Sequence, residues 1–215
     1  LAMISMNYKS KDMRANAAFH FGDIASSAWS PVYNMIQEAN AGVRLHKNIW
    51  LDAGFFKSHV GLESFQPREN ITSSMAMMSF NNPYFFSGAK LTYLVNDKLS
   101  LQVCGFNGYN TFIAINKKKS FDITANYAPN EHISITYNFL TSDNSADDAK
   151  VKQQRFYNNL YATFVYKKFT VGVDINYGMQ QNSNRLNSKK SADLFGALIV
   201  AKYNLNRFVD VYGRV

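Results

Sequence analysis

The chain has 215 residues, 47% of them hydrophobic and 15% aromatic, with a formal net charge of +8 and one cysteine. This composition excludes a disordered chain, and a lone cysteine excludes an internal disulfide framework. A basic chain can bind nucleic acid, an anionic membrane surface or anionic solutes. The sequence has no basic helix and no nucleic-acid-binding motif, so we expect no nucleic-acid partner.

Apolar and polar residues alternate along most of the chain, most clearly in 121–127, 133–139 and 171–177. Such alternation predicts strands with one apolar and one hydrophilic face. No apolar run is long enough for a transmembrane helix, but most of the alternating runs are about 8 to 12 residues long, which matches the roughly 9 to 11 residues of a tilted strand that crosses a bilayer. About twelve strands are predicted, namely 1–8, 13–22, 38–46, 49–57, 84–95, 98–109, 119–128, 132–140, 155–166, 169–180, 192–203 and 208–215.

The connections between these strands alternate strictly in length. Short ones fall at 9–12, 47–48, 96–97, 129–131, 167–168 and 204–207, and long ones at 23–37, 58–83, 110–118, 141–154 and 181–191. Outer-membrane barrels have short periplasmic turns and long external loops, whereas a soluble sandwich gives no reason for this alternation. The pattern predicts an all-β, transmembrane, antiparallel up-and-down β-barrel.

We expect residues 1–215 to form a single outer-membrane β-barrel domain with a long inserted loop at 58–83. If the short turns are periplasmic, one further strand should precede Leu1 and another should follow Val215. The full chain would then have about 14 or more strands, an even number as is usual for bacterial barrels. The domain is therefore expected to be incomplete at both ends of this sequence.

Two of the long connections carry helix signals. Ser30 and Pro31 resemble an N-cap followed by proline at the first helical position, and the apolar residues that would share one side of that helix are Val32, Met35, Ile36 and Ala39. In the insertion, Asn70 or Thr72 is expected to cap a short helical turn through Ser73–Phe80. Both helices are expected to pack against the barrel rim or wall.

A pore needs hydrophilic side chains on its inner face. The pore-lining candidates are Arg14, Asn16, His20, Arg44, His46, Asp52, Lys90, Gln102, Asp122, Asn126, Asn138, Asp174 and Asn176. Their mixed charges predict salt-bridge ladders and a weakly selective lumen, with a mild anion preference because the whole chain is basic.

The insertion supplies the constriction-loop candidates, which are His59, Glu63, Arg68, Glu69 and Asn70. Their spacing matches no metal signature, so salt bridges that anchor the loop to the wall are the favoured interpretation. His20, His46 and His132 lie in separate strands without a neighbouring ligand pair. We expect no metal and no cofactor, and we expect Cys104 to be a small packing residue.

Several segments resemble the OmpL-like β-barrel porins (the porin-2 family) of Bacteroidetes outer membranes. They are Trp50–Phe56, Ser58–Ser64, Asn70 with Thr72 and Ser74, Asn82–Lys90 and Asn107–Tyr109, and the rest of the chain agrees only in strand rhythm. The resemblance implies an outer-membrane porin through which small hydrophilic solutes or ions diffuse passively. The implied partners are outer-membrane lipid and those solutes, with a homo-oligomer or association with other outer-membrane proteins left open.

Three alternatives stay open from the sequence alone. An outer-membrane hydrolase would need a converging serine and histidine, but Ser58 and His59 are adjacent and no Gly-x-Ser-x-Gly elbow is present, so no enzyme is expected. A non-conducting receptor or structural barrel gives the same pattern as a porin. A soluble β-protein would turn its apolar face inward, whereas aromatic girdles favour lipid, and the girdle candidates are Tyr84, Tyr127, Tyr137, Tyr166, Tyr177 and Tyr203.

Overall fold

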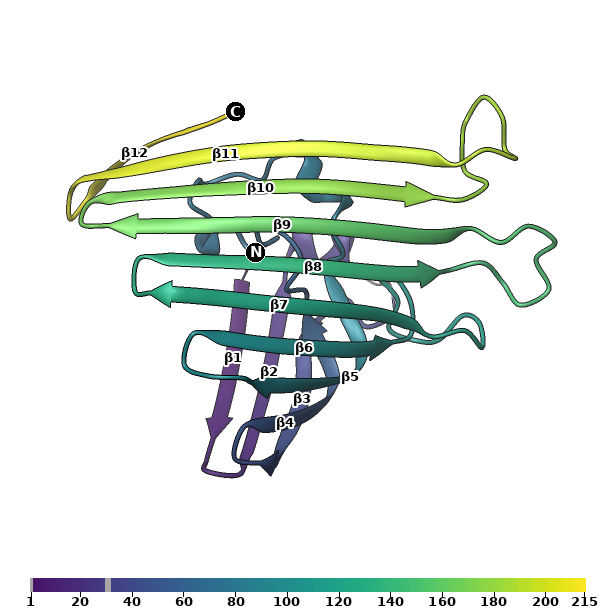
Figure 1. The fold of residues 1–215 in the computed structure, drawn as a ribbon, viewed down its shortest axis with the longest axis horizontal. Helices are drawn as coiled ribbons and strands as arrows, with labels where there is room; N and C mark the ends of the chain where they lie inside the picture. The colour runs from purple at the N-terminus through teal and green to yellow at the C-terminus, as the bar shows by residue number, and fades with distance from the viewer. Residues whose placement is uncertain (1, 30–31) are drawn as a thin grey trace.

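The computed structural model describes residues 2–29 and 32–215. Within these residues, twelve strands form one antiparallel sheet in which each strand pairs with the next along the chain (Figure 1). The strands are β1 Ala2–Lys9, β2 Met13–Phe21, β3 Ile36–His46, β4 Ile49–Lys57, β5 Phe85–Leu94, β6 Leu99–Phe106, β7 Ser120–Asn130, β8 Ile133–Asp143, β9 Gln154–Tyr166, β10 Phe169–Gln180, β11 Ala192–Asn206 and β12 Val209–Arg214. The predicted up-and-down topology is confirmed, and most strand ends lie within a few residues of the prediction.

The connections alternate in length as predicted, with the short turns at one end of the sheet and the long connections at the other (Figure 1). Asparagine closes three of the short turns in the same way. The side-chain oxygens of Asn96, Asn130 and Asn206 each accept hydrogen bonds from the backbone N–H groups two and three residues further on. Asparagine favours such turns because its side chain satisfies backbone donors locally.

The sheet curls around the connection between β4 and β5, residues 58–84. In Figure 1, β7 to β11 lie on the near side and β1 to β5 lie behind them. Side chains of β7, β9, β10 and β12 all hydrogen-bond to this connection, so it lies inside the curled sheet. It contains two short 3-10 helices, η1 Pro67–Glu69 and η2 Met77–Asn81.

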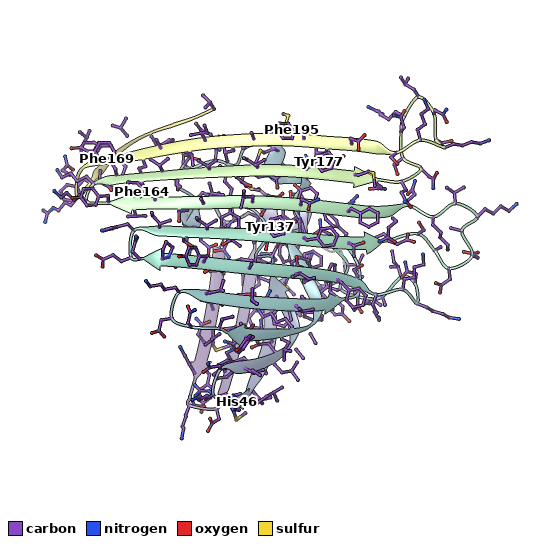
Figure 2. All side chains as sticks on the ribbon, in the orientation of Figure 1. His46, Tyr137, Phe164, Phe169, Tyr177 and Phe195 are labelled. Atoms are coloured by element: carbon purple, nitrogen blue, oxygen red, sulfur yellow. The ribbon has the colours of Figure 1, made fainter. Side chains whose placement is uncertain are left out.

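The two faces of the sheet have opposite character. On β7, Phe121 and Ile123 are 52% and 51% exposed, whereas Asp122 between them is fully buried. Figure 2 shows Tyr137, Phe164, Phe169, Tyr177 and Phe195 along the strands, and all five are exposed. An apolar outward face with a hydrophilic inward face is the arrangement of a lipid-embedded barrel. It overturns the soluble alternative, which required the reverse.

Four of the girdle candidates face outward, as a girdle requires. They are Tyr127, Tyr137, Tyr166 and Tyr177, and they are 43% to 47% exposed. The prediction was wrong for Tyr84. This residue precedes β5 and packs against an interior cluster of Trp29, Phe65, Phe85 and Phe112. It belongs to the inserted loop rather than to a lipid-facing strand end.

The first helix prediction was wrong in position. The helix is α1 Asp23–Ala28, which lies before the predicted cap, and Ser30 and Pro31 lie outside the described residues. Ile36 and Ala39 belong to β3, where pairing with β2 decides their conformation. No helix among the described residues has the length and apolar character needed to cross a bilayer.

The helical turn in the insertion forms as η2, without the predicted caps. Asn70 instead forms two hydrogen bonds with the backbone of Ser64, and the Thr72 hydroxyl donates to the Ser74 carbonyl. Both side chains therefore form hydrogen bonds within the loop. No side-chain hydrogen bond caps the N-terminus of η2.

Candidate functional site

The inward face carries a ladder of hydrogen-bonded polar side chains that spans β7 to β10. Strand register places Thr124, Asn138, Asn159 and Asn176 opposite one another on β7 to β10. Thr124 donates to Asn138 over 2.8 Å, Asn138 to Asn159 over 2.8 Å, and Asn159 to Asn176 over 2.9 Å. Each of these side chains is less than a tenth exposed. The ladder satisfies buried polar groups that would otherwise carry a desolvation cost.

An ionic row crosses the other half of the sheet, where Arg14, Gly42, Asp52 and Lys90 lie opposite one another on β2 to β5. Arg14 reaches past Gly42 and pairs with Asp52 through Nε, 2.6 Å from Oδ1, and through Nη2. A Cβ at Gly42 would lie 2.1 Å from Oδ1 of Asp52, so the glycine leaves room for this pair. One rung of the predicted salt-bridge ladder is thereby confirmed.

The loop meets the wall first at His59. Its Nε2 lies 2.6 Å from Oδ1 of Asp122 on β7, and Nε2 of Gln102 on β6 lies 3.3 Å from the same ring nitrogen. The imidazole also packs against Phe86, with ring centroids 5.2 Å apart. Two pore-lining candidates and one loop candidate therefore converge at one point of the interior.

The next residues of the loop bind the wall through their backbone. The Gly61 N–H donates to Oδ1 of Asn159 over 2.9 Å, and the Leu62 N–H donates to Oδ2 of Asp174 over 2.9 Å. Asp174 is fully buried and also accepts hydrogen bonds from Asn159 and Asn176. These hydrogen bonds satisfy the buried carboxyl group and attach the loop to β9 and β10.

Glu63 anchors the loop to β12. Its Oε1 lies 2.9 Å from Nη1 of Arg214 on β12, while its Oε2 accepts from the Ala76 N–H and the Ser79 hydroxyl. Arg214 also donates to the Ser74 carbonyl over 2.6 Å. The predicted role of salt bridges as anchors is confirmed for Glu63.

Glu69 pairs with Lys57 at the end of β4, with Nζ 2.5 Å from Oε2. Partial burial opposes ionisation of Glu69, but hydrogen bonds from Lys57 and Ser64 and the positive charges of Lys57 and Arg68 outweigh it and lower the pKa of the carboxyl group. Arg68 itself is exposed. The ion pair of Lys57 and Glu69 thus adds a weaker anchor between the end of β4 and the loop.

The remaining pore-lining candidates do not belong to one common network. Asn16 donates to Asn40 over 3.0 Å, and Asn126 donates to Thr136 over 2.7 Å. His20 is buried edge-on against Trp29. Arg44 lies over the Trp50 ring. His46 is exposed and pairs with Ile49 after an irregularity in the register of β3, so it lies apart from the inward network.

Apolar residues fill the interior near the long connections. Phe86, Phe106, Leu140 and Tyr157 pack with Cys104, which is 1% exposed, so its predicted packing role is confirmed. Beyond them, a cavity of about 210 Å³ is lined by residues of the loop and by Tyr161 of the wall, and one of about 340 Å³ lies near the ends of β9, β10 and β11. In the described part of the chain, no three His, Cys, Asp or Glu side chains gather as a metal site would require.

Sequence reasoning missed Asn159, Arg155 and Arg214 on the inward face. Asn158 and Asn159 are adjacent polar residues, so alternation alone does not say which of them faces inward. The structure shows Asn158 bonded to the exposed Tyr137 and Asn159 buried in the ladder. Tyr157, Asn159 and Tyr161 share one face of β9. The sequence does not say that this face points inward, so alternation alone did not select Asn159.

This curled antiparallel sheet, with its apolar exterior, hydrophilic interior and internal loop, defines a transmembrane β-barrel of the bacterial outer membrane. The family model described as "Putative beta-barrel porin-2, OmpL-like" matches residues 1–215, and the chain belongs to that family. A comparison with curated proteins finds no match. An origin in Bacteroidetes stays a prediction.

Solved outer-membrane proteins show a distant likeness. OccAB4 of Acinetobacter baumannii is 14% identical, with a TM-score of 0.47, over 94% of this chain and 56% of its own. OpdQ of Pseudomonas aeruginosa is 13% identical, with a TM-score of 0.48, over 95% of this chain and 54% of its own. The trimer form of OmpT, an outer membrane protein of Vibrio cholerae, is 11% identical, with a TM-score of 0.48, over 99% of this chain and 78% of its own. The chain thus spans little more than half the length of OccAB4 and OpdQ.

Proposed function

We propose that the protein is a porin through which small hydrophilic solutes or ions diffuse passively, with the 58–84 loop narrowing the lumen. The observation that carries this proposal is the inward network, because polar side chains on the inner wall solvate water and solutes while the outer face meets lipid. Family membership supports a channel rather than the hydrolase alternative. The formal net charge of +8 supports the proposed mild anion preference.

The test is single-channel conductance of the full-length protein in a planar bilayer, with selectivity measured from the reversal potential in a salt gradient. Stable ohmic steps with a small preference for chloride are expected. A cation preference would contradict the proposed selectivity, and insertion without conductance would contradict an open pore.

A loop replacement tests the constriction. Lys57 and Phe85 lie opposite each other at the ends of β4 and β5, so a short Gly-Ser turn can replace 58–84 without altering the strands. Gln180 and Ala192 are likewise opposed, which allows a matched shortening of the 181–191 connection as a control. Conductance should rise severalfold in the first variant alone. Equal conductance in both variants would show that the 58–84 loop does not limit the current.

A plugged, non-conducting barrel is the second candidate, because Asn138, Asn159 and Asn176 are at most 1% exposed beneath the loop. Conductance that appears only after loop replacement would favour it.

A further inference from the structure

The 340 Å³ cavity lies at the long-connection end of β9, β10 and β11, beside η2 of the inserted loop. Arg155, Tyr157 and Gln180 of the wall line it, and Phe80 and Asn81 of the loop border it. Its volume is within the range of small-molecule sites, which begins at about 300 Å³. A solute that enters from the long-connection end would meet this space.

Arg155 is held in place at this cavity by two neighbours. Its Nε and Nη2 donate to Oε1 of Gln180 over 3.0 and 2.6 Å, and its guanidinium lies 4.0 Å from the centroid of the Tyr109 ring. The Tyr109 hydroxyl in turn donates to the Asn81 carbonyl of the loop. The guanidinium is therefore fixed before any solute arrives, which reduces the entropy lost on binding.

A second cavity of about 60 Å³ shares Tyr109, Arg155 and Gln180 with the first. Its other residues are polar and come from the 144–153 connection and its flanks, including Ser142, Asn144 and Gln153. The side chain of Arg155 thus forms part of the boundary of both spaces. A solute group in either space could reach this cation.

The charge of Arg155 is not neutralised by the protein. Within the described residues, no Asp or Glu carboxylate forms an ion pair with Arg155, and both of its hydrogen bonds end on a neutral amide. Asp193 borders the first cavity, but its carboxylate accepts from the hydroxyl of Tyr177, which is exposed on the outward face (Figure 2). A fixed cation without a carboxylate partner attracts an anion from outside.

The rest of the lining suggests the kind of anion. Tyr157, Leu194 and Phe80 give the cavity apolar and aromatic surface beside the guanidinium. Arginine presents a planar set of donors that matches the two oxygens of a carboxylate. We propose that this cavity is a binding site for small organic carboxylates with an apolar body, with Arg155 binding the carboxylate group.

This site adds a solute class to the proposed porin function. Transport of the carboxylate through the barrel rests on that function, whereas binding of the carboxylate at the cavity does not. Benzoate serves as the charged probe, and benzamide as its neutral counterpart of similar shape. In planar bilayers, benzoate should reduce the potassium chloride current saturably, and benzamide should not. Arg155→Gln should raise the half-blocking benzoate concentration at least tenfold, whereas Arg155→Lys should raise it less.

Arg185→Gln is the matched control, because it removes an exposed arginine of the 181–191 connection at the same end of the barrel. It should leave benzoate block unchanged. If both glutamine variants lost benzoate block equally, the block would be an effect of general surface charge, and the proposed site would be overturned. Equal block by benzoate and benzamide would overturn recognition of the carboxylate.

Calorimetric titration of the refolded barrel with benzoate separates the site from transport. Binding that is lost in Arg155→Gln and kept in Arg185→Gln supports the site even if no variant conducts, in which case only the porin function fails. Absence of benzoate binding to a wild-type barrel that conducts would overturn the site and leave the porin function intact.

Discussion

The backbone N–H of Leu62 donates to Oδ2 of Asp174 over 2.9 Å, which joins the inserted loop to a strand 112 residues further along the chain. Asp174 has no exposed surface, and its other carboxylate oxygen accepts from Asn159 and Asn176. One carboxylate thus unites the loop, β9 and β10. Its removal should affect the wall and the loop together.

We expect Asp174→Asn to destabilise the barrel by about 1–3 kcal/mol, the range for leaving a buried hydrogen-bonding group unsatisfied. The new amide would also direct donors at groups that already donate. Urea unfolding in lipid vesicles measures the change, and Asp148→Asn, at an exposed loop carboxylate, is the control. Equal unfolding curves for the two variants would contradict the structural role of Asp174.

Gly61→Ala should loosen the loop. Gly61 has a φ of +94°, and a Cβ there would lie 2.1 Å from Nδ2 of Asn82. Such strain costs on the order of 1–3 kcal/mol. Faster proteolysis within 58–84 is expected, while Gly213→Ala, where no atom lies within 4 Å of the new Cβ, should behave as wild type. Unchanged proteolysis of Gly61→Ala would show that the loop tolerates the change.

The Lys57–Glu69 pair predicts a pH dependence of the loop anchor. The pKa of Glu69 is lowered from its ordinary value of 4.5, so the pair stabilises the fold above that pH and loses its effect as pH falls through the lowered pKa. Because both side chains are about a third exposed, less than about 1 kcal/mol is expected. Glu69→Gln should remove this part of the acid response, measured as unfolding midpoint between pH 7 and strongly acidic pH. If Glu69→Gln destabilised the barrel relative to wild type more at acidic pH than at pH 7, this prediction would be contradicted.

The two faces of the sheet should respond differently to an introduced lysine. Ile123 is 51% exposed on the lipid side, whereas Gln102 faces the interior beside His59. Ile123→Lys should cost up to about 2–4 kcal/mol, depending on depth in the bilayer. Gln102→Lys should cost less and should instead change ion selectivity. Refolding yield and urea unfolding in vesicles measure the first effect, and reversal potential measures the second. A greater cost at Gln102 would reverse the assignment of the faces.

Alternation and connection length were enough to predict the strands, their order and the interior position of Asp52, Asp122 and Asp174. These signals are local, because a period of two decides which residues share a face. The partners of the loop were not predictable, since Arg214 and Glu63 meet only after the sheet has curled around the loop. The helix at 23–28 was missed because its six residues carry little periodicity. Continuation of the barrel beyond both ends of the sequence and the oligomeric state stay predictions.

The loop's three main anchors have a consequence for the order of folding. His59, Leu62 and Glu63 bind residues 63, 112 and 151 positions away, and all of these partners are synthesised after the loop itself. Contacts between distant parts of a chain form slowly, because closing the intervening segment costs entropy first. The hairpin of β4 and β5 can therefore assemble early, while its loop gains the last of these anchors only when β12 has arrived. Docking would then proceed in steps, at β7, β10 and β12 in turn, and a chain arrested before β12 would carry the Glu63 end of the loop unanchored.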